Sequence, residues 1–434
     1  MSKVFAPNFP FHPKNCPIFY GWIILFCAIC TRIISIPGYT VGICPFIEPL
    51  IKNLGISRNS LSNIFLFATL SSTLILPSLG KIFDRVGVRK SITYSSLFFG
   101  ISIFFLGNIP VLVRCLSSFL TNSTATITAL LLGIFLLKLF GQGSIPLASR
   151  MMLLHWYDKK SCTMLGITGV FISAIFGVAP KIIDMLVKKY GYLQTWTIMA
   201  FIILTTFVPL IWAICRDNPQ QVGLELDGQA SKNSDELCTS SSKTLDQAVR
   251  TFDFWIFVIA ASNTIFLTTG LQIHIVDIFR EAQADTNYAM GIFIPISIFS
   301  AIGGILSILQ DKISIKYCLI AIFLTHFLLL ISIEWLGSSI GLGIFAILFG
   351  GTWALHGIVF SAPWPKLFGR KHLGHIMSTV SLISAIFSSI APSVMSYTKH
   401  YGGSYFLATR TVAVLSLIYL AVSVIYIIKT RKKL

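Results

Sequence analysis

One arginine stands near the middle of a long apolar segment. Arg32 lies in the stretch 19–47, where no other residue is charged, and Tyr39 falls on the same helical face two turns later. If the stretch is a helix, Arg32 lies about 18–20 Å from its start, near its midpoint. A charge at mid-membrane costs at least about 2.5 kcal/mol, so it needs a water-filled cavity or a partner. A guanidinium can form two parallel hydrogen bonds with a carboxylate, so this position predicts capture of an anion.

Other polar side chains lie in further apolar segments. Lys138 lies about as deep as Arg32, and Gln142 follows one turn later on the same face. Histidine titrates nearest to physiological pH, so His274 and His356 could carry a proton. In contrast, all 16 acidic residues fall in predicted loops or close to segment ends. The candidate substrate-binding residues are Arg32, Tyr39, Lys138, Gln142, His274 and His356.

The apolar segments are long enough to cross a membrane as helices. Of 434 residues, 55% are hydrophobic and 11% charged, and the mean hydropathy is +0.80, whereas soluble domains carry about 25% charged residues. In lipid every backbone polar group must be paired within the protein, and continuous apolar runs of about 20 residues indicate helices. We predict an all-α polytopic membrane protein with twelve transmembrane helices, near residues 19–47, 60–80, 91–112, 125–153, 162–182, 193–214, 252–276, 287–309, 316–334, 339–364, 374–396 and 404–428.

A polar segment divides these spans into two sets of six. Residues 216–250 are rich in serine and contain no apolar run. The first span of each half begins alike, with "GWIILFCA" and "FWIFVIAA". Two related six-helix halves with a binding site at their interface are a layout found in transporters. We therefore expect an N-terminal bundle at 1–215, a linker at 216–250 and a C-terminal bundle at 251–434.

The basic residues indicate how the chain is oriented. The net charge is +17, from 33 lysine and arginine residues against 16 acidic ones. Most basic residues outside the spans fall in loops that an N-in orientation places inside, and the positive-inside rule then puts both termini in the cytoplasm. The excess charge thus requires no nucleic-acid partner. The nine cysteines are scattered, mostly within spans, so we expect no metal site and no cofactor.

The loop between the second and third spans carries the motif "GKIFDRVGVRK". Gly80 permits close helix approach and Gly87 a tight turn, and the basic residues of the motif are expected to anchor the inner face. The spacing resembles the signature loop of the major facilitator superfamily. That resemblance implies two pseudo-symmetric six-helix halves, with spans one, four, seven and ten around a central cavity, and a loop that gates conformational change without binding substrate. The gating residues would be Gly80, Asp84, Arg85, Gly87, Arg89 and Lys90.

Other stretches narrow the resemblance to one branch of that superfamily. "FYGWIILFCA", "GICPFIEPLIKNLGISRNSLS" and "RDNPQQVGLELDG" resemble the monocarboxylate-porter and oxalate–formate-exchanger-like branch, although Leu226 stands where proline is usual. The branch implies transport of a small, monocarboxylate-like organic anion, by symport with a proton or by exchange. It also implies a monomer that lies in the cytoplasmic (inner) membrane of a bacterium. We expect such a multi-pass transporter, alternating between inward and outward access.

Other functions remain open from the residues alone. The main alternative is an importer of a neutral solute, such as a sugar or an amino acid; an exporter of cationic drugs or metabolites would need a buried acid, which no predicted span contains. A membrane enzyme could use His372 and His375 as metal ligands, but a third ligand is lacking, so we expect no enzyme. Structural roles are also open: Arg32 could bond to backbone carbonyls, and Lys138 in "KLFGQG" could serve helix packing.

Overall fold

The described part of the chain is helical and contains no strand. A computed structural model describes residues 9–157, 160–225, 243–306, 315–361, 363–369 and 373–431. Eleven helical segments there are long and apolar enough to cross a membrane, and Phe293–Gly303 is a shorter apolar helix within the predicted eighth span. The predicted all-α polytopic membrane fold is thereby confirmed. The helices are α1 (Tyr20–Ile34), α2 (Thr40–Leu54), α3 (Arg58–Val86), α4 (Val88–Gly107), α5 (Ile109–Leu116), α6 (Asn122–Leu137), α7 (Ile145–Trp156), α8 (Ser161–Tyr190), α9 (Tyr192–Ile202), α10 (Val208–Ile214), α11 (Leu245–Val249), α12 (Phe252–Glu281), α13 (Phe293–Leu306), α14 (Ile315–Ser332), α15 (Ser339–Ser361), α16 (Pro363–Phe368), α17 (Leu373–Gly402) and α18 (Tyr405–Arg431).

The first predicted span is interrupted near its middle. A short 3₁₀ turn, Ile36–Gly38, separates α1 from α2. Pro37 lacks the backbone N–H that would continue the α-helix, which accounts for the interruption. Gly38 then approaches the fourth span so closely that a Cβ added to it would lie 2.6 Å from the Gly141 Cα. Only glycine permits this approach, so the interruption doubles as a packing site.

The fourth predicted span changes its winding at the same place. Between α6 and α7, residues Lys138–Ser144 form a π-helix. Widened turns of this kind are frequent at functional sites in α-helices. Gly141 lies within this turn and contacts Gly38. The irregular parts of spans one and four therefore meet; they contain the candidate residues Lys138 and Gln142, and Tyr39 directly follows the first of them.

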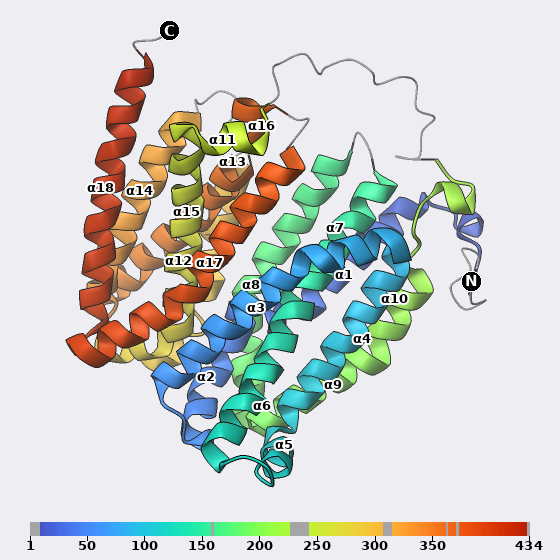
Figure 1. Ribbon diagram of the computed structural model, residues 1–434, viewed down its shortest axis with the longest axis horizontal. Helices are drawn as coiled ribbons and strands as arrows, with labels where there is room; N and C mark the ends of the chain where they lie inside the picture. Colours follow the sequence, from blue (N-terminus) through green and yellow to red (C-terminus); the bar gives the residue numbers. More distant parts are fainter. Residues whose placement is uncertain are drawn as a thin grey trace. The chain divides into compact units, whose positions relative to one another are not determined.

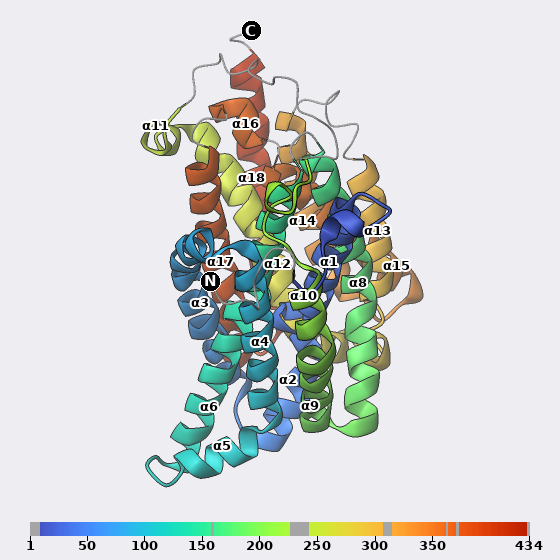
Figure 2. The ribbon, with the colours of Figure 1, turned by 90° about the vertical axis from the view of Figure 1, so that its right-hand side faces the viewer.

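The first compact unit contains the chain up to Ile56 and from Phe67 to the linker. In it α4 lies beside α9 and α10 (Figures 1 and 2), while α1 packs on α7 and α2 on α8. Aromatic side chains join these helices in the interior. Phe46 of α2 stacks on Trp196 of α9 with ring centroids 3.8 Å apart, and both residues are buried. In a membrane, close van der Waals packing of such side chains, together with hydrogen bonds between helices, holds the helices together.

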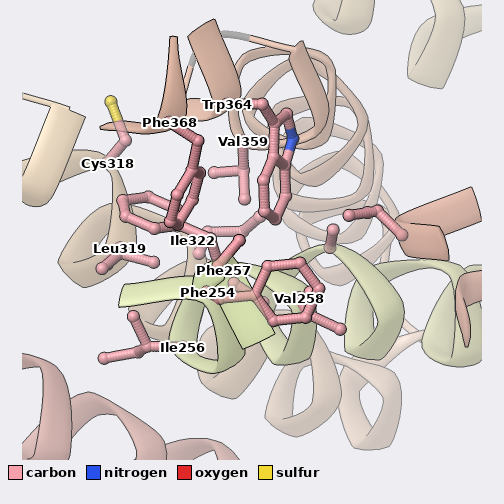
Figure 3. Packing of buried hydrophobic residues seen from close by; sticks show 14 of the residues in the cluster. Phe254, Ile256, Phe257, Val258, Cys318, Leu319, Ile322, Val359, Trp364 and Phe368 are labelled. Atoms are coloured by element: carbon pink, nitrogen blue, oxygen red, sulfur yellow. The ribbon is translucent and has the colours of Figure 1, made fainter. Parts of the chain in front are cut away.

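The second compact unit contains the chain after the linker, together with Ser57–Leu66. Here α12 packs on α17, and α14 lies against α15 and α18. An apolar cluster closes one end of the unit, where Phe254 and Phe257 of α12 face Trp364 of α16 (Figure 3). The Trp364 indole also donates to the Phe360 carbonyl, 2.9 Å away.

The first residues of α3 pack with this second unit. The Arg58 Nε lies 3.6 Å from the Asp277 Oδ2 of α12, and the Asn63 amide donates to the Tyr397 hydroxyl of α17 over 2.9 Å. These polar contacts explain why Ser57–Leu66 groups with α12 and α17. The predicted bundle limits at 215 and 251 remain an expectation, because part of the linker lies outside the described residues.

Candidate functional site

Arg32 lies in the last turn of α1 and is half-buried. Its Nε is shielded from solvent and has no hydrogen-bond partner among the described residues. The Arg32 backbone carbonyl accepts a 2.7 Å hydrogen bond from the Ser35 hydroxyl. None of the ion pairs found in the described part of the chain includes the Arg32 guanidinium. A charged group that is shielded but unpaired is costly, which makes Arg32 a strong binding candidate.

Arg150 of α7 lies close to Arg32, and the sequence interpretation missed it. The Ser149 hydroxyl, one residue earlier, donates to the Ala28 carbonyl over 3.2 Å, and Ala28 is one turn before Arg32. Arg150 interacts electrostatically with both Arg32 and Tyr39. The predicted fourth span ended at residue 153, which made Arg150 resemble a basic residue at a span end. The helix continues to Trp156, so Arg150 lies within α7 and not at its end.

Tyr39 follows the turn that interrupts the first span, and it is half-buried. Its ring lies against Phe176 of α8, with centroids 5.0 Å apart. Together with its electrostatic interaction with Arg150, this packing fixes the ring between α7 and α8. Arg32, Arg150 and Tyr39 therefore form one group of side chains in the first unit, which we call the arginine group.

Lys138 and Gln142 contact each other, as their spacing predicts. The Lys138 Nζ donates to the Gln142 Oε1 over 2.9 Å and to the Thr40 hydroxyl over 3.3 Å. Lys138 is 2% exposed. Its amine thus joins the π-helix of span four to the start of α2. Whether it also binds substrate stays a prediction, but its observed contacts favour a role in packing.

His274 has partners for both ring nitrogens. Its Nε2 lies 3.0 Å from the Pro392 carbonyl oxygen, and its Nδ1 lies 3.2 Å from the Tyr405 hydroxyl. A carbonyl can only accept, so Nε2 carries the hydrogen and Nδ1 accepts from the tyrosine. His274 therefore ties α12 to α17 and α18 as a neutral, buried side chain. This geometry favours structure over the predicted substrate contact.

His356 of α15 differs from His274 in this respect. Its Nδ1 is shielded from solvent and has no hydrogen-bond partner among the described residues. Its ring lies against Phe360, with centroids 5.3 Å apart. His326 of α14 is close enough to interact with it electrostatically, and both His326 nitrogens are held by Asn263 and Thr264. In the second unit, His356 is thus the predicted residue with spare hydrogen-bonding capacity.

The predicted gating motif runs from the end of α3 into the start of α4. Gly80 lies opposite α7, where an added Cβ would be 3.8 Å from the Leu147 side chain. Gly87 has a φ of 94°, in the region that favours glycine, and precedes the first turn of α4. The Asp217 carboxylate caps that helix by accepting a 2.7 Å hydrogen bond from the Arg89 backbone N–H. Arg85 is exposed and Lys90 half-buried, whereas nothing is described of the Asp84 side chain.

The sequence interpretation expected Arg89 to anchor the inner face from the surface. The structure corrects this, because Arg89 is buried and only 1% exposed. Its guanidinium donates to the Trp212 carbonyl over 2.9 Å and to the Phe9 carbonyl over 2.7 Å. Arg216 acts similarly: it donates to the Phe11 carbonyl over 3.1 Å, and burial lowers the pKa of its guanidinium. Two buried arginines thus hold the N-terminal segment on the first unit. Phe9 is so distant from Arg89 in the sequence that no local sequence pattern predicts this hydrogen bond.

Comparisons with known proteins agree with this fold. A profile of the Major Facilitator Superfamily matches residues 21–392. The chain belongs to the major facilitator superfamily. It is therefore a multi-pass membrane transporter rather than an enzyme. No curated protein matches the sequence.

Two crystal structures with this superfamily fold come from a bacterial homologue of the human lysosomal transporter Spinster. The inward-facing, unoccupied structure has a TM-score of 0.66, with 93% of this chain and 95% of that chain covered. The inward-facing, occupied structure has a TM-score of 0.65, with 96% and 98% covered. Sequence identity is 13% in both cases, so the likeness shows the fold alone.

Metal chemistry finds no support in the described ranges. There, no three His, Cys, Asp or Glu side chains are grouped so that they could hold a metal ion. His372, considered above as a metal ligand, lies outside the described residues.

Proposed function

We propose that this superfamily member is a secondary active transporter of a small organic anion and works by alternating access. The observation that supports this most directly is the Arg32 Nε, which is shielded from solvent and has no hydrogen-bond partner among the described residues. A cation at this depth in a membrane is costly unless a partner neutralises it. An anionic substrate would supply the partner in each transport cycle. Its negative charge would bind through paired, charge-assisted hydrogen bonds.

Acidic side chains of the described residues have other partners. Asp277 pairs with Arg280, Glu334 with Arg410 and Asp184 with Lys188. Glu281 contacts Lys399. These pairs lie toward helix ends, so they leave Arg32 without a carboxylate partner in the described part of the chain. An anionic substrate would supply the negative charge that these four carboxylates do not.

Several finer features belong to the same proposal. We expect coupling to a proton or exchange against a second anion, a monomer, and a location in the cytoplasmic membrane with both termini inside. We also expect the Gly80–Lys90 loop to act as a gate. Asp84→Asn should then slow turnover while leaving substrate affinity nearly unchanged; tenfold weaker binding at a normal turnover rate would contradict the gating role.

Uptake into proteoliposomes tests the anion proposal. The panel would contain labelled lactate, pyruvate and acetate, with glucose and alanine as neutral solutes. We expect uptake of at least one anion, reduced in Arg32→Lys because lysine lacks the planar two-pronged geometry. Arg32→Gln should be nearly inactive, since losing a buried charge-assisted contact costs about 2–5 kcal/mol. Arg114→Gln, which changes an exposed arginine of the same unit, is the matched control.

Thermal unfolding separates binding from structural roles of Arg32. The transported anion should raise the melting temperature of the wild type and of Arg114→Gln, but not that of a well-folded Arg32→Gln protein. If the rise survives in Arg32→Gln, Arg32 does not capture the anion. Uptake of a neutral solute, without uptake of any of the anions, would support the alternative of a neutral-solute importer.

A further inference from the structure

We propose that Arg150 is a second anion-binding side chain beside Arg32, and that the pair selects an organic anion carrying two negative charges. This inference rests on the proposed anion transport and makes its substrate class narrower. It departs from the monocarboxylate expected from the resemblance, because one carboxylate would neutralise only one of the two guanidinium groups.

The helix contact between α1 and α7 places the two arginines together. The Ser149 hydroxyl lies 3.2 Å from the Ala28 carbonyl oxygen. Arg32 follows Ala28 by four residues, and Arg150 follows Ser149 by one. At a rise of 1.5 Å per residue on antiparallel helices, the two Cα atoms are offset by about 8 Å along the axes. Both side chains are long enough to reach a common ligand across this offset.

Neither arginine is neutralised by the chain itself, so far as its residues are described. Arg32 and Arg150 form no ion pair with a described carboxylate. Among the described residues, Arg32 repels the Arg150 guanidinium, and Tyr39 also lies close enough to interact with it electrostatically. Two like charges held close together raise the energy of the empty site, and the repulsion falls when an anion lies between them. A doubly charged anion removes it fully.

The position of Arg150 suits ligand contact. It is exposed, whereas its neighbours Ser149 and Met152 are buried against the bundle. Arg150 is therefore free to move toward a ligand without breaking a hydrogen bond of the described structure. The opposing interpretation is that Arg150 reaches for the membrane surface and takes no part in recognition. The two interpretations differ in selectivity, which can be measured.

The test compares anions of one and two charges on the purified full-length protein. Binding is measured by thermal shift and by calorimetry, with butyrate, succinate, glycerol 3-phosphate and neutral butyramide as probes. The proteins are the wild type, Arg150→Gln, Arg150→Lys and, as control, His155→Gln, which changes an exposed residue on the same helix. Succinate separates its two charges and glycerol 3-phosphate places both on one group, so these probes distinguish the two sources of a double charge.

We expect the wild type to bind succinate or glycerol 3-phosphate at least about tenfold more tightly than butyrate, the effect of one additional charge-assisted contact. Arg150→Gln should reduce this ratio to about one, because it weakens binding of the doubly charged probes more than binding of butyrate, whereas Arg150→Lys and His155→Gln should keep the ratio. A ratio unchanged in Arg150→Gln, or a wild type that prefers butyrate, overturns the inference while the anion proposal stands. If the wild type binds butyramide and none of the anions, the proposed function itself fails.

Discussion

The contact between Gly38 and Gly141 supports a sharp prediction about Gly38→Ala. The new Cβ would lie 2.6 Å from the Gly141 Cα and 2.8 Å from its carbonyl carbon, closer than real Cβ atoms come. Both neighbours are backbone atoms, so no side chain can rotate away. Ordinary contact at 3.5–4.0 Å requires the two segments to separate by about 1 Å. Overpacking of this kind costs about 1–3 kcal/mol.

The assay is thermal unfolding of the purified protein in detergent. In domains of 150–250 residues, each kcal/mol lowers the melting temperature by about 2–4 °C, so a cost of about 1–3 kcal/mol predicts a fall of about 2–12 °C. Uptake should fall as well, because Tyr39 and Thr40 follow Gly38 directly. Gly169→Ala is the control: its Cβ would meet nothing within 4 Å, and alanine is the better helix former. If Gly38→Ala melts within about 1 °C of Gly169→Ala, the close approach is not a structural requirement.

Two more substitutions test the gating loop and the histidines. Gly87→Ala combines a strained φ of 94° with a Cβ 2.9 Å from the Asp217 carboxylate, whereas Gly191→Ala has a similar φ of 82° and no neighbour within 4 Å. The melting temperature should therefore fall further in Gly87→Ala than in Gly191→Ala. Equal falls would show that backbone strain alone matters. His356→Gln should flatten the dependence of uptake on pH if transport is proton-coupled. His274→Gln should chiefly lower the melting temperature by removing two hydrogen bonds. A pH profile that changes in His274→Gln and not in His356→Gln would reverse these roles.

Part of the candidate site was predictable because it depends on local properties. Depth within a span follows from counting residues, so Arg32 could be placed near mid-membrane from the sequence. The contact between Lys138 and Gln142 was likewise predictable, because residues four apart on a helix are neighbours. Arg150 was missed because its proximity to Arg32 depends on how α7 packs against α1. Helix packing is a matter of tertiary contacts, which hydropathy does not record.

The sequence by itself determined the helical fold class and the superfamily. In a membrane each span must pair its own backbone groups, so the fold class is encoded segment by segment. Only the tertiary structure decided which lysine and arginine side chains already have hydrogen-bond partners or charged neighbours within the protein. Lys138 turns to Thr40, Arg89 donates to the Phe9 carbonyl, and Arg150 comes to lie near Arg32. Such partners are distant in the chain and meet only when the helices pack, so residue type and spacing alone do not reveal which charge is left for a substrate.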